Sequence, residues 1–452
     1  MDSSIRVRFS TEYEEYRVMN TAFAVPLKLG RKGLSEVIRH LLSSSSSSSS
    51  ASENSADANL MIDFDFVING FLLRTSLMKF IESQKLSNEE VLTILYMPAL
   101  HLPEESKSTE VPSWVGSIDS SIEGFIATGC YNGQLQIFQA SDLSLQLTIE
   151  ASSHPLRAVK TYSSPTQDFI ITGSKDHSIK CYAFSESKKD SKISASQAAQ
   201  LKGHANSVEC LDTVNISQTH ILLSGDWSGG IIGWDLRALE SHNPNTDENE
   251  AGVRKKTKLN STIAQPQIDI KPLFTLKGHS QCISSLQGEG VADGKLYSCS
   301  WDHSIKEWDV SRQDSVHSWV GSKVITSMHL SGSASSGNTA GSSLLLTSHT
   351  DGKIRLWDPR ERETGLSRQT FGADSKQWVS QVRWHPRSPQ HFASTDYEGK
   401  LHLWDLRSAS SAVASKSVHN GKALCVDWIS DNRILTGGSD CCLTTSDMGT
   451  YF

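Results

Sequence analysis

The chain has 452 residues, 37% of them hydrophobic, and a formal net charge of −7. That length exceeds one ordinary hydrophobic core and predicts several domains or one large repeat architecture. The small charge excludes a whole-protein attraction to nucleic acid or to an anionic membrane. No apolar run reaches the roughly 20 residues of a bilayer crossing. The N-terminus lacks the apolar core of a secretory signal.

The beginning of the chain predicts two strands and a helix. IRVRFS (5–10) and VPLKLG (25–30) alternate as half-buried strands do, with Val25, Leu27 and Leu29 on one face of the second. GLSEVIRHLL (33–42) spaces its apolar residues as a helix does, with Ser35 as a possible N-cap. The serine run that follows predicts a disordered, low-complexity loop over residues 43–60.

A hairpin, a short helix and a last strand complete this first region. FDFVI and FLLR flank Asn69-Gly70, which is a strong signal for a type I′ turn. TSLMKFIESQ predicts a short helix and VLTILY a final strand. The order strand, strand, helix, strand, strand, helix, strand predicts a ubiquitin-like β-grasp domain of the α+β class over residues 1–97.

The remainder of the chain is built from repeats. Four Trp-Asp pairs each close a stretch with an apolar strand, a turn and a second strand, as in LYSCSWDHSIKEWD (296–309). Three further stretches have the same pattern with another residue in the tryptophan position. The seven hallmark residues are Phe138, Tyr182, Trp234, Trp308, Trp357, Trp404 and Ser446.

These repeats resemble the WD40 family, whose units of about 40–45 residues form four-stranded propeller blades. The resemblance implies a hydrogen-bonded set of four side chains across a blade, and one unit has all four. They are His279, Ser298, Asp302 and Trp308. We interpret this His-Asp pair as structural and not as a catalytic dyad.

Two repeats depart from that set at the turn. Ser228 occupies the aspartate position in the unit that ends at Trp234, and Glu398 occupies it in the unit that ends at Trp404. Without the turn aspartate, these two blades are expected to depend more on packing.

Residues 98–452 therefore predict a seven-bladed WD40 β-propeller, which makes the whole chain mainly β. A polar, turn-rich insertion over residues 238–270 is expected to be disordered. The chain ends just after the third strand of the last blade. A strand from between Pro98 and Ser117 is therefore expected to supply the fourth, because an open strand edge would otherwise remain.

The 8 cysteines include no CxxC pair. We expect them to be reduced and mostly buried as small hydrophobic residues, as in the cytosol or nucleus. They are Cys130, Cys181, Cys210, Cys282, Cys299, Cys425, Cys441 and Cys442.

Three segments of the first region carry a more specific resemblance. GLSEVIRHLL, FDFVINGFLLRTSL and LSNEEVLTILY, ahead of seven repeats, resemble the NLE-domain proteins of ribosome assembly. LLRTSL and the blade count place the chain with the Ytm/WD-repeat-twelve branch rather than with its sibling Notchless. The resemblance covers essentially the whole chain outside the Ser-rich loops.

The resemblance implies a non-catalytic role in the PeBoW complex with pescadillo and the Bop protein, in the nucleus, nucleolus and nucleoplasm. The propeller would bind the WD40 propeller of the Bop partner. The front domain would engage midasin, an AAA ATPase that releases the complex from the pre-60S ribosomal particle. Maturation of the large-subunit rRNAs and formation of the 60S subunit would depend on these steps.

The resemblance also implies one contact residue. Midasin holds Mg²⁺ in a metal-ion-dependent adhesion site with an open position, and a carboxylate of the bound protein completes the shell. The family places that carboxylate in the LSxE stretch, which is Glu89 in this chain, with Glu90 as its neighbour. The chain would then need no cofactor of its own. The residues alone favour an ordinary solvated loop acid at Glu89, and it is the family resemblance that assigns it the contact.

The sequence also bears on three other functions. Enzyme motifs such as GxxxxGK[ST], HExxH and GxSxG do not occur in the sequence. A WD40 adaptor with a ubiquitin-like domain in ubiquitin signalling stays open at the level of the fold, and co-sedimentation with large-subunit precursors would discriminate it. The basic stretch Arg254–Lys258 fits RNA contact, a nuclear import signal or a solvated loop run.

Overall fold

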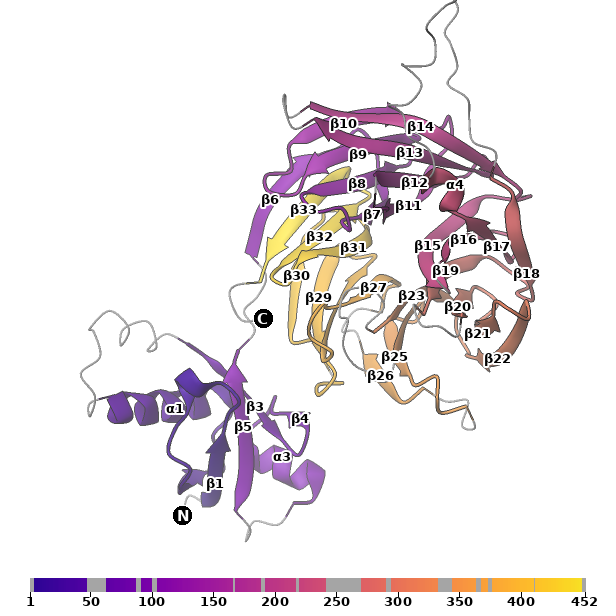
Figure 1. Cartoon of the computed structure of the whole chain (residues 1–452). Coiled ribbons are helices and arrows are strands. Elements are labelled where there is room, and N and C mark those ends of the chain that lie inside the picture. The colour runs from indigo at the N-terminus through magenta and orange to yellow at the C-terminus, as the bar shows by residue number, and fades with distance from the viewer. Residues whose placement is uncertain are drawn as a thin grey trace, which may run out of the picture. The chain divides into compact units, whose positions relative to one another are not determined.

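The computed structural model describes residues 4–46, 62–86, 91–99, 104–165, 167–187, 192–216, 219–240, 270–289, 294–331, 344–362, 367–372, 376–409 and 411–448. The chain divides into two compact units, with the main boundary between Leu102 and Pro103 (Figure 1). Within the described ranges, no helix has the length and apolar character that a membrane crossing requires.

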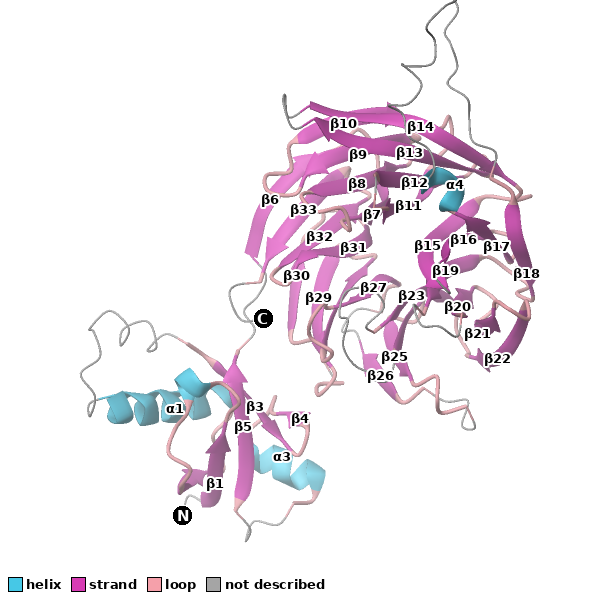
Figure 2. Cartoon of the chain, viewed as in Figure 1, coloured by secondary structure: helices cyan, strands magenta, loops and turns pink. Residues whose placement is uncertain are grey.

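The first unit is a five-stranded mixed sheet with two helices and a short 3-10 turn (Figure 2). The strand order is β2-β1-β5-β3-β4, and β1 runs parallel to β5 while the other neighbours are antiparallel. This arrangement is the β-grasp that the sequence predicts. Its elements are β1 (Ser4–Ser10), η1 (Glu14–Tyr16), β2 (Ala22–Pro26), α1 (Arg31–Ser46), β3 (Phe64–Ile68), β4 (Phe71–Leu72), α3 (Leu77–Gln84) and β5 (Leu92–Pro98).

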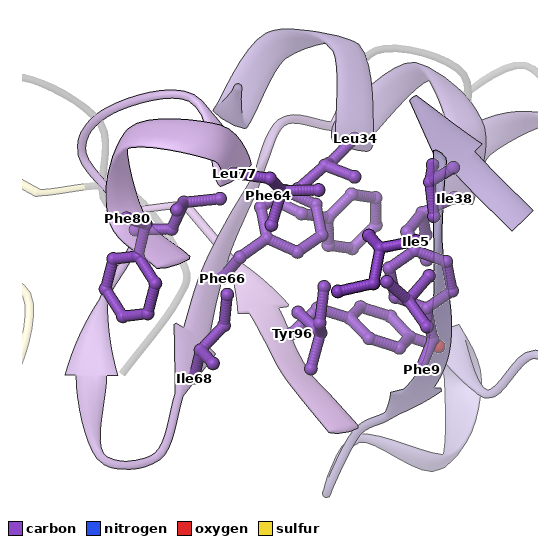
Figure 3. Packing of buried hydrophobic residues seen from close by; sticks show 14 of the residues in the cluster. Ile5, Phe9, Leu34, Ile38, Phe64, Phe66, Ile68, Leu77, Phe80 and Tyr96 are labelled. Atoms are coloured by element: carbon purple, nitrogen blue, oxygen red, sulfur yellow. The ribbon is translucent and has the colours of Figure 1, made fainter. Parts of the chain in front are cut away.

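Alternating residues of the strands and one stripe of each helix form the core of this unit (Figure 3). Phe64 and Phe66 of β3 are fully buried, and Leu34 of α1 and Leu77 of α3 pack with them. Burying a phenylalanine side chain stabilises a fold by about 1.5–3 kcal/mol. These contacts fix the helices on the sheet and hold the loop between α3 and β5 by both ends.

The Asn69-Gly70 turn prediction is confirmed. Asn69 and Gly70 have φ angles of 50° and 83°, and the two positive values are those of a type I′ turn. The predicted second strand is wrong in its position. β2 covers Ala22–Pro26, and the chain turns directly after Pro26 with Leu29 N–H bonded to its carbonyl oxygen at 3.1 Å. Leu27 and Leu29 reach the core from this turn instead.

Ser35 is not the N-cap of the first helix, which begins four residues earlier at Arg31. Its side chain is buried and bridges to β3, accepting from Phe64 N–H at 3.0 Å and donating to Phe64 O at 3.1 Å. β4 pairs only with the far end of β3, so Ser35 satisfies backbone groups that lack a strand neighbour. The helix also continues to Ser46, into the predicted loop, while residues 47–61 lie outside the described part.

The second unit consists of seven four-stranded antiparallel sheets arranged about a central axis (Figure 1). The innermost strands β7, β11, β15, β19, β23, β27 and β31 contact one another in turn and close the ring. The seven-bladed propeller prediction is confirmed. All seven hallmark residues lie on third strands, as their positions in the repeats require.

The strands of the first four blades have the following bounds. They are β7 (Val115–Asp119), β8 (Phe125–Cys130), β9 (Gln134–Gln139), β10 (Leu145–Glu150), β11 (Leu156–Ser163), β12 (Asp168–Ser174), β13 (Ser178–Ser187), β14 (Lys192–Lys202), β15 (Val208–Ile216), β16 (Thr219–Asp226), β17 (Gly230–Asp235), β18 (Pro272–Lys277), β19 (Ile283–Gly288), β20 (Lys295–Ser300), β21 (Ser304–Asp309) and β22 (Asp314–Val320).

The last three blades follow the same order. Their strands are β23 (Ile325–Leu330), β24 (Leu345–His349), β25 (Lys353–Trp357), β26 (Gln369–Gly372), β27 (Val379–Trp384), β28 (His391–Asp396), β29 (Lys400–Asp405), β30 (Ala414–Ser417), β31 (Ala423–Ser430), β32 (Arg433–Gly438) and β33 (Cys442–Asp447).

The outer strand of the last blade comes from the segment between the two domains. β6 (Glu104–Glu110) pairs antiparallel with β33, and Val111 N–H donates to Cys441 O at 2.8 Å just beyond the pair. The closure that the sequence predicts is confirmed. It ties the start of the propeller to its end and leaves β33 without an open edge.

The predicted insertion over residues 238–270 is too wide at both ends. A short helix, α4 (Arg237–Glu240), occupies its first residues, and Ile270 is buried against the blade. Leu239 is also fully buried, so apolar side chains anchor both ends of the segment. Residues 241–269, including the basic stretch Arg254–Lys258, lie outside the described part of the chain.

Candidate partner-binding surfaces

The predicted contact residues Glu89 and Glu90 lie outside the described residues, but both ends of their loop are defined. Before the loop, α3 ends at Gln84 and is capped by Lys85, which has a left-handed φ of 53°, and Leu86 N–H bonds to Ile81 O at 3.1 Å. Leu86 packs on the domain core. After it, β5 enters the sheet between β1 and β3. The loop is therefore carried between a capped helix and a central strand.

The four residues predicted for the fourth blade form one hydrogen-bonded chain. His279 bonds through Nδ1 to Asp302 Oδ2 at 2.8 Å and through Nε2 to Ser298 Oγ at 2.7 Å. Trp308 Nε1 donates to the same Ser298 Oγ at 2.7 Å. Burial would raise the pKa of Asp302, but hydrogen bonds from His279 and Ser304 hold it well below its usual value. Together, the four side chains of this network join the loop, the second strand, the turn and the third strand of the blade.

The blade that ends at Trp234 has the same chain, which corrects the expectation that it depends more on packing. Its aspartate is Asp226, at the end of β16 and two residues before Ser228. His204 bonds to Asp226 Oδ2 at 2.9 Å and to Ser224 Oγ at 2.6 Å, and Trp234 Nε1 donates to Ser224 Oγ at 2.8 Å. Ser228 instead donates to Asp226 at 2.7 Å. Compared with the fourth blade, the aspartate of this turn stands two residues earlier than Asp302 does, and a serine occupies the position of Asp302.

The blade that ends at Trp404 has two separate side-chain pairs in place of one chain, because the other ring nitrogen of its histidine, His402, bonds to Ser415 Oγ at 2.7 Å and not to Ser394. His402 lies on β29 itself and bonds to Asp396 Oδ2 at 3.0 Å. Glu398 at the turn donates its backbone N–H to Asp396 at 2.9 Å. Trp404 Nε1 donates to Ser394 Oγ at 2.9 Å. The aspartate again stands at the end of the second strand.

Asp226 makes the stability of the third blade depend on pH. Burial would raise its pKa, but hydrogen bonds from His204, Ser228 and the Gly230 N–H lower it from 3.8 to about 2. A lowered carboxyl pKa adds stability above the unfolded value, and this stability is lost as the pH falls through the folded value. Asp226→Asn cannot titrate, so its stability deficit against wild type should shrink by about 2 kcal/mol between pH 5 and pH 2.

Urea unfolding followed by tryptophan fluorescence measures this difference, because all 11 tryptophans lie in the propeller. Asp314→Asn, on the exposed start of β22, is the matched control. A deficit of Asp226→Asn that stays constant over the pH range would contradict an ionised Asp226 in the blade network.

One equivalent residue from each blade lines the axial cavity of the propeller, which has a volume of about 540 Å³. Every innermost strand has a β-bulge at its start, and the lining residue stands at the same distance after each bulge. We call this set the axial belt. Its members are Asp119, Lys160, Asp212, Gln287, His329, Arg383 and Asp427.

The axial belt bridges every pair of neighbouring blades. In blade order, the contacts are Lys160 Nζ to Asp119 Oδ2 and to Asp212 Oδ1 (both 3.4 Å), Gly288 N to Asp212 Oδ2 (3.1 Å), Leu330 N to Gln287 Oε1, Trp384 N to His329 Nδ1 (3.1 Å), Arg383 Nε to Asp427 Oδ1 (4.0 Å) and Ser120 N to Asp427 Oδ2 (3.0 Å).

The protonation of the belt matches these contacts. Burial would lower the pKa of Lys160, but Asp119 and Asp212 raise it, so the ammonium stays charged. Burial, Arg383 and Lys160 lower the pKa of His329 well below its usual value. A neutral ring can accept the Trp384 N–H through Nδ1. Because each of these contacts joins neighbouring blades, we interpret the belt as the closure of the ring.

The axial belt is not among the sites predicted from the sequence, although one signal points to it. Aligning the seven innermost strands places a polar residue at the same position in each. The described residues contain no group of three or more His, Cys, Asp or Glu side chains that could hold a metal ion.

Comparison with known proteins identifies both units. Residues 5–81 match the NLE (NUC135) domain, and residues 144–182, 270–309 and 365–405 match the WD domain, G-beta repeat. A rice protein named ribosome biogenesis protein WDR12 homolog is 31% identical over 443 residues, covering 96% of this chain and 94% of its own. Proteins of the same name from Arabidopsis thaliana (29%, covering 96% and 95%) and Chlamydomonas reinhardtii (28%, covering 97% of each) match similarly.

Proposed function

This chain belongs to the WDR12 family, so its role lies in ribosome biogenesis, and within that role we propose that it is a non-catalytic assembly factor of the large ribosomal subunit. The observation that carries the proposal is the match to the rice relative over nearly the full length of both chains. The factor would act in the nucleus, nucleolus and nucleoplasm, in the maturation of the large-subunit rRNAs.

The propeller would bind the WD40 propeller of a Bop-type protein, in a complex that includes pescadillo. What supports a binding role is the closed ring. The belt bonds hold the blades together from within, and the His–Asp pairs described above are used in blade networks. A rigid scaffold of this kind presents preformed surfaces, which lowers the ordering cost of binding.

The front domain would present Glu89 to the Mg²⁺ that midasin holds in its adhesion site. The loop ends described above support this role, because Leu86 packs on the core before Glu89 in the sequence and β5 lies in the sheet after it. A hard cation prefers an anionic oxygen ligand. The chain would supply that ligand in trans, and midasin would then release the complex from the pre-60S particle.

Glu89→Gln tests the proposal with little expected change in shape. The amide is a poor ligand for Mg²⁺, so binding to the isolated adhesion domain of midasin should weaken at least about tenfold. Glu89→Asp keeps the charge on a shorter side chain and should be impaired less. Binding should require Mg²⁺ in the wild type, and the Glu89→Gln variant should enter pre-60S particles and accumulate on them in sedimentation profiles.

Glu90→Gln is the paired comparison, because Glu90 is the other predicted contact residue; it leaves Glu89 in place and should weaken binding less than Glu89→Gln does. Mg²⁺-independent binding by Glu89→Gln at wild-type strength would refute the assignment of Glu89. A chain that never co-sediments with large-subunit precursors would refute the assembly role itself and favour the ubiquitin-signalling reading.

A further inference from the structure

Aromatic residues gather at one end of the propeller. The first residue after the second strand is aromatic in four blades, as Tyr131, Trp227, Trp301 and Tyr397. Two more tryptophans, Trp114 and Trp378, stand just before first strands. Backbone bonds from Tyr131 N to Trp114 O and from Tyr397 N to Trp378 O, both 3.0 Å, join the two positions. Both therefore belong to the same end of the blades.

This end is unusually exposed for its residue types. Trp114, Trp227 and Trp378 are 47%, 46% and 40% exposed, and they are the exposed tryptophans of the described residues. Tryptophan is normally highly buried on average. Tryptophan and tyrosine are also enriched among the residues that dominate binding at protein interfaces. Three exposed tryptophans at one end of a propeller indicate a binding surface.

Two of the aromatic rings at this end, those of Tyr131 and Tyr397, are already in contact with cationic side chains of the same protein. The Arg157 guanidinium lies 5.3 Å from the centre of the Tyr131 ring, and Lys422 Nζ lies 4.6 Å from that of Tyr397. Trp227 and Trp301 form a T-shaped pair with ring centres 5.1 Å apart. Within the described ranges, no cation of the chain covers this pair.

Two carboxylates flank the tryptophan pair in sequence. Asp226 directly precedes Trp227, and Asp302 directly follows Trp301. The histidine and serine hydrogen bonds described above keep the pKa of both below the usual value, so both are ionised at neutral pH. Glu209 adds a third carboxylate at the mouth of the cavity, where it pairs with Arg157 at 2.7 Å. Asp226 and Asp302 are already bonded to His204 and His279, and Glu209 is paired with Arg157. What this end offers to a cation is therefore the uncovered tryptophan pair itself.

We propose that this end of the propeller binds a partner protein through an arginine side chain that stacks on the Trp227–Trp301 pair. Arginine suits the site better than lysine, because its planar guanidinium stacks on aromatic faces. The proposal deepens the proposed function and rests on it, since it takes the propeller to be the domain that binds the Bop-type protein. Stacking of RNA bases on the same pair is the alternative that the second experiment below tests.

The first experiment measures binding of the full chain to a purified Bop-type WD40 protein. Trp227→Leu keeps an apolar side chain but removes the ring, and should weaken binding about tenfold. Trp227→Phe keeps a weaker ring and should lose less. Val320→Ala, at a 70% exposed position on an outer strand, should stay within about twofold of wild type. Trp227→Leu binding as wild type does would overturn the inference and leave the proposed function standing.

The second experiment uses an oligo-arginine peptide and a uridine oligonucleotide on the same variants, read by tryptophan fluorescence. Saturable binding of the peptide that disappears in Trp227→Leu supports the inference even if the Bop-type protein does not bind, in which case the proposed partner is wrong. Failure of the peptide to bind the wild-type chain, or oligonucleotide binding that depends on Trp227, overturns the inference.

Discussion

Replacing Lys160 by methionine should lower the free energy of unfolding of the propeller by about 3–5 kcal/mol at neutral pH. Lys160 Nζ lies 3.4 Å from both Asp119 and Asp212, whose side chains are only 7% and 12% exposed. Methionine fills a similar volume but leaves two buried carboxylates without their shared cation. Removing one partner of a buried ion pair is costly for this reason, even where the intact pair adds little.

The stability lost in Lys160→Met should depend on pH, and the direction of this dependence identifies the uncompensated carboxylates as its cause. In the wild type, burial opposes ionisation of Asp119, but Lys160 and the hydrogen bond from Thr161 lower its pKa. Without Lys160, burial should raise the folded-state pKa of a belt carboxylate. A raised carboxyl pKa costs stability above that pKa, and the cost disappears as the pH falls through it. The difference in the free energy of unfolding between Lys160→Met and the wild type should therefore become smaller from pH 7 to pH 5.

Two further variants separate charge from packing. Lys160→Arg keeps the cation and should retain most of the stability. Adding Asp212→Asn to Lys160→Met removes one of the two uncompensated charges and should restore part of it, as a double-mutant cycle would show. Urea unfolding followed by tryptophan fluorescence provides the measurement. A Lys160→Met propeller as stable as wild type at pH 7 would mean that the belt does not hold the ring closed.

Local sequence patterns predict the fold because each element here is specified over short distances. Asn69-Gly70 has the positive φ angles of a tight hairpin in any context, and each Trp-Asp pair ends a strand whose partner is a few residues away. The missing fourth strand of the last blade could be inferred because an open edge must be covered. β6 then lies where that argument requires it.

Side-chain networks could not be predicted as well, because they depend on where atoms lie rather than on which residue occupies a motif position. Asp226 reaches His204 from a position two residues before the expected one, since both positions lie at the same tight turn. His402 replaces a loop histidine from within its own strand. Ser35 looks like a helix cap in sequence, and only the short β4 explains why it bonds to Phe64.

A disulfide across the β6–β33 seam should stabilise the propeller by up to about 5 kcal/mol. Glu110 is the direct partner of Cys442, and Val111 N–H bonds to Cys441 O next to them. Positions 110 and 442 therefore form a non-hydrogen-bonded pair, in which the Cα atoms lie about 4.5 Å apart. That spacing suits a disulfide, so Glu110→Cys should cross-link to the native Cys442 under mild oxidation.

The seam is the place where such a link has the greatest effect. β6 has the sequence EESKSTE and brings no apolar side chain to the blade, whereas β18 and β22 contribute Phe274, Leu276 and Trp319 to the buried core. β6 is thus held to β33 mainly by hydrogen bonds, while the apolar contact between the first and last blades comes from residues such as Val115 and Cys425. A link there also joins the two ends of the whole propeller, and the entropy that a disulfide removes from the unfolded chain grows with loop length.

Thr109→Cys is the matched control, because Thr109 pairs with Leu443 and points to the opposite face of the strand. It should neither cross-link to Cys442 nor raise the melting temperature. The stability gained by Glu110→Cys should appear in oxidised protein and vanish on reduction with dithiothreitol. It should arise mainly from slower unfolding, because the seam must part before the blades separate. If the thiols at positions 110 and 442 do not cross-link, the register of β6 against β33 is wrong. If they cross-link without slowing unfolding, the ring opens between two other blades. The longest contact of the axial belt, Arg383 Nε to Asp427 Oδ1 at 4.0 Å, then marks the next pair of blades to cross-link.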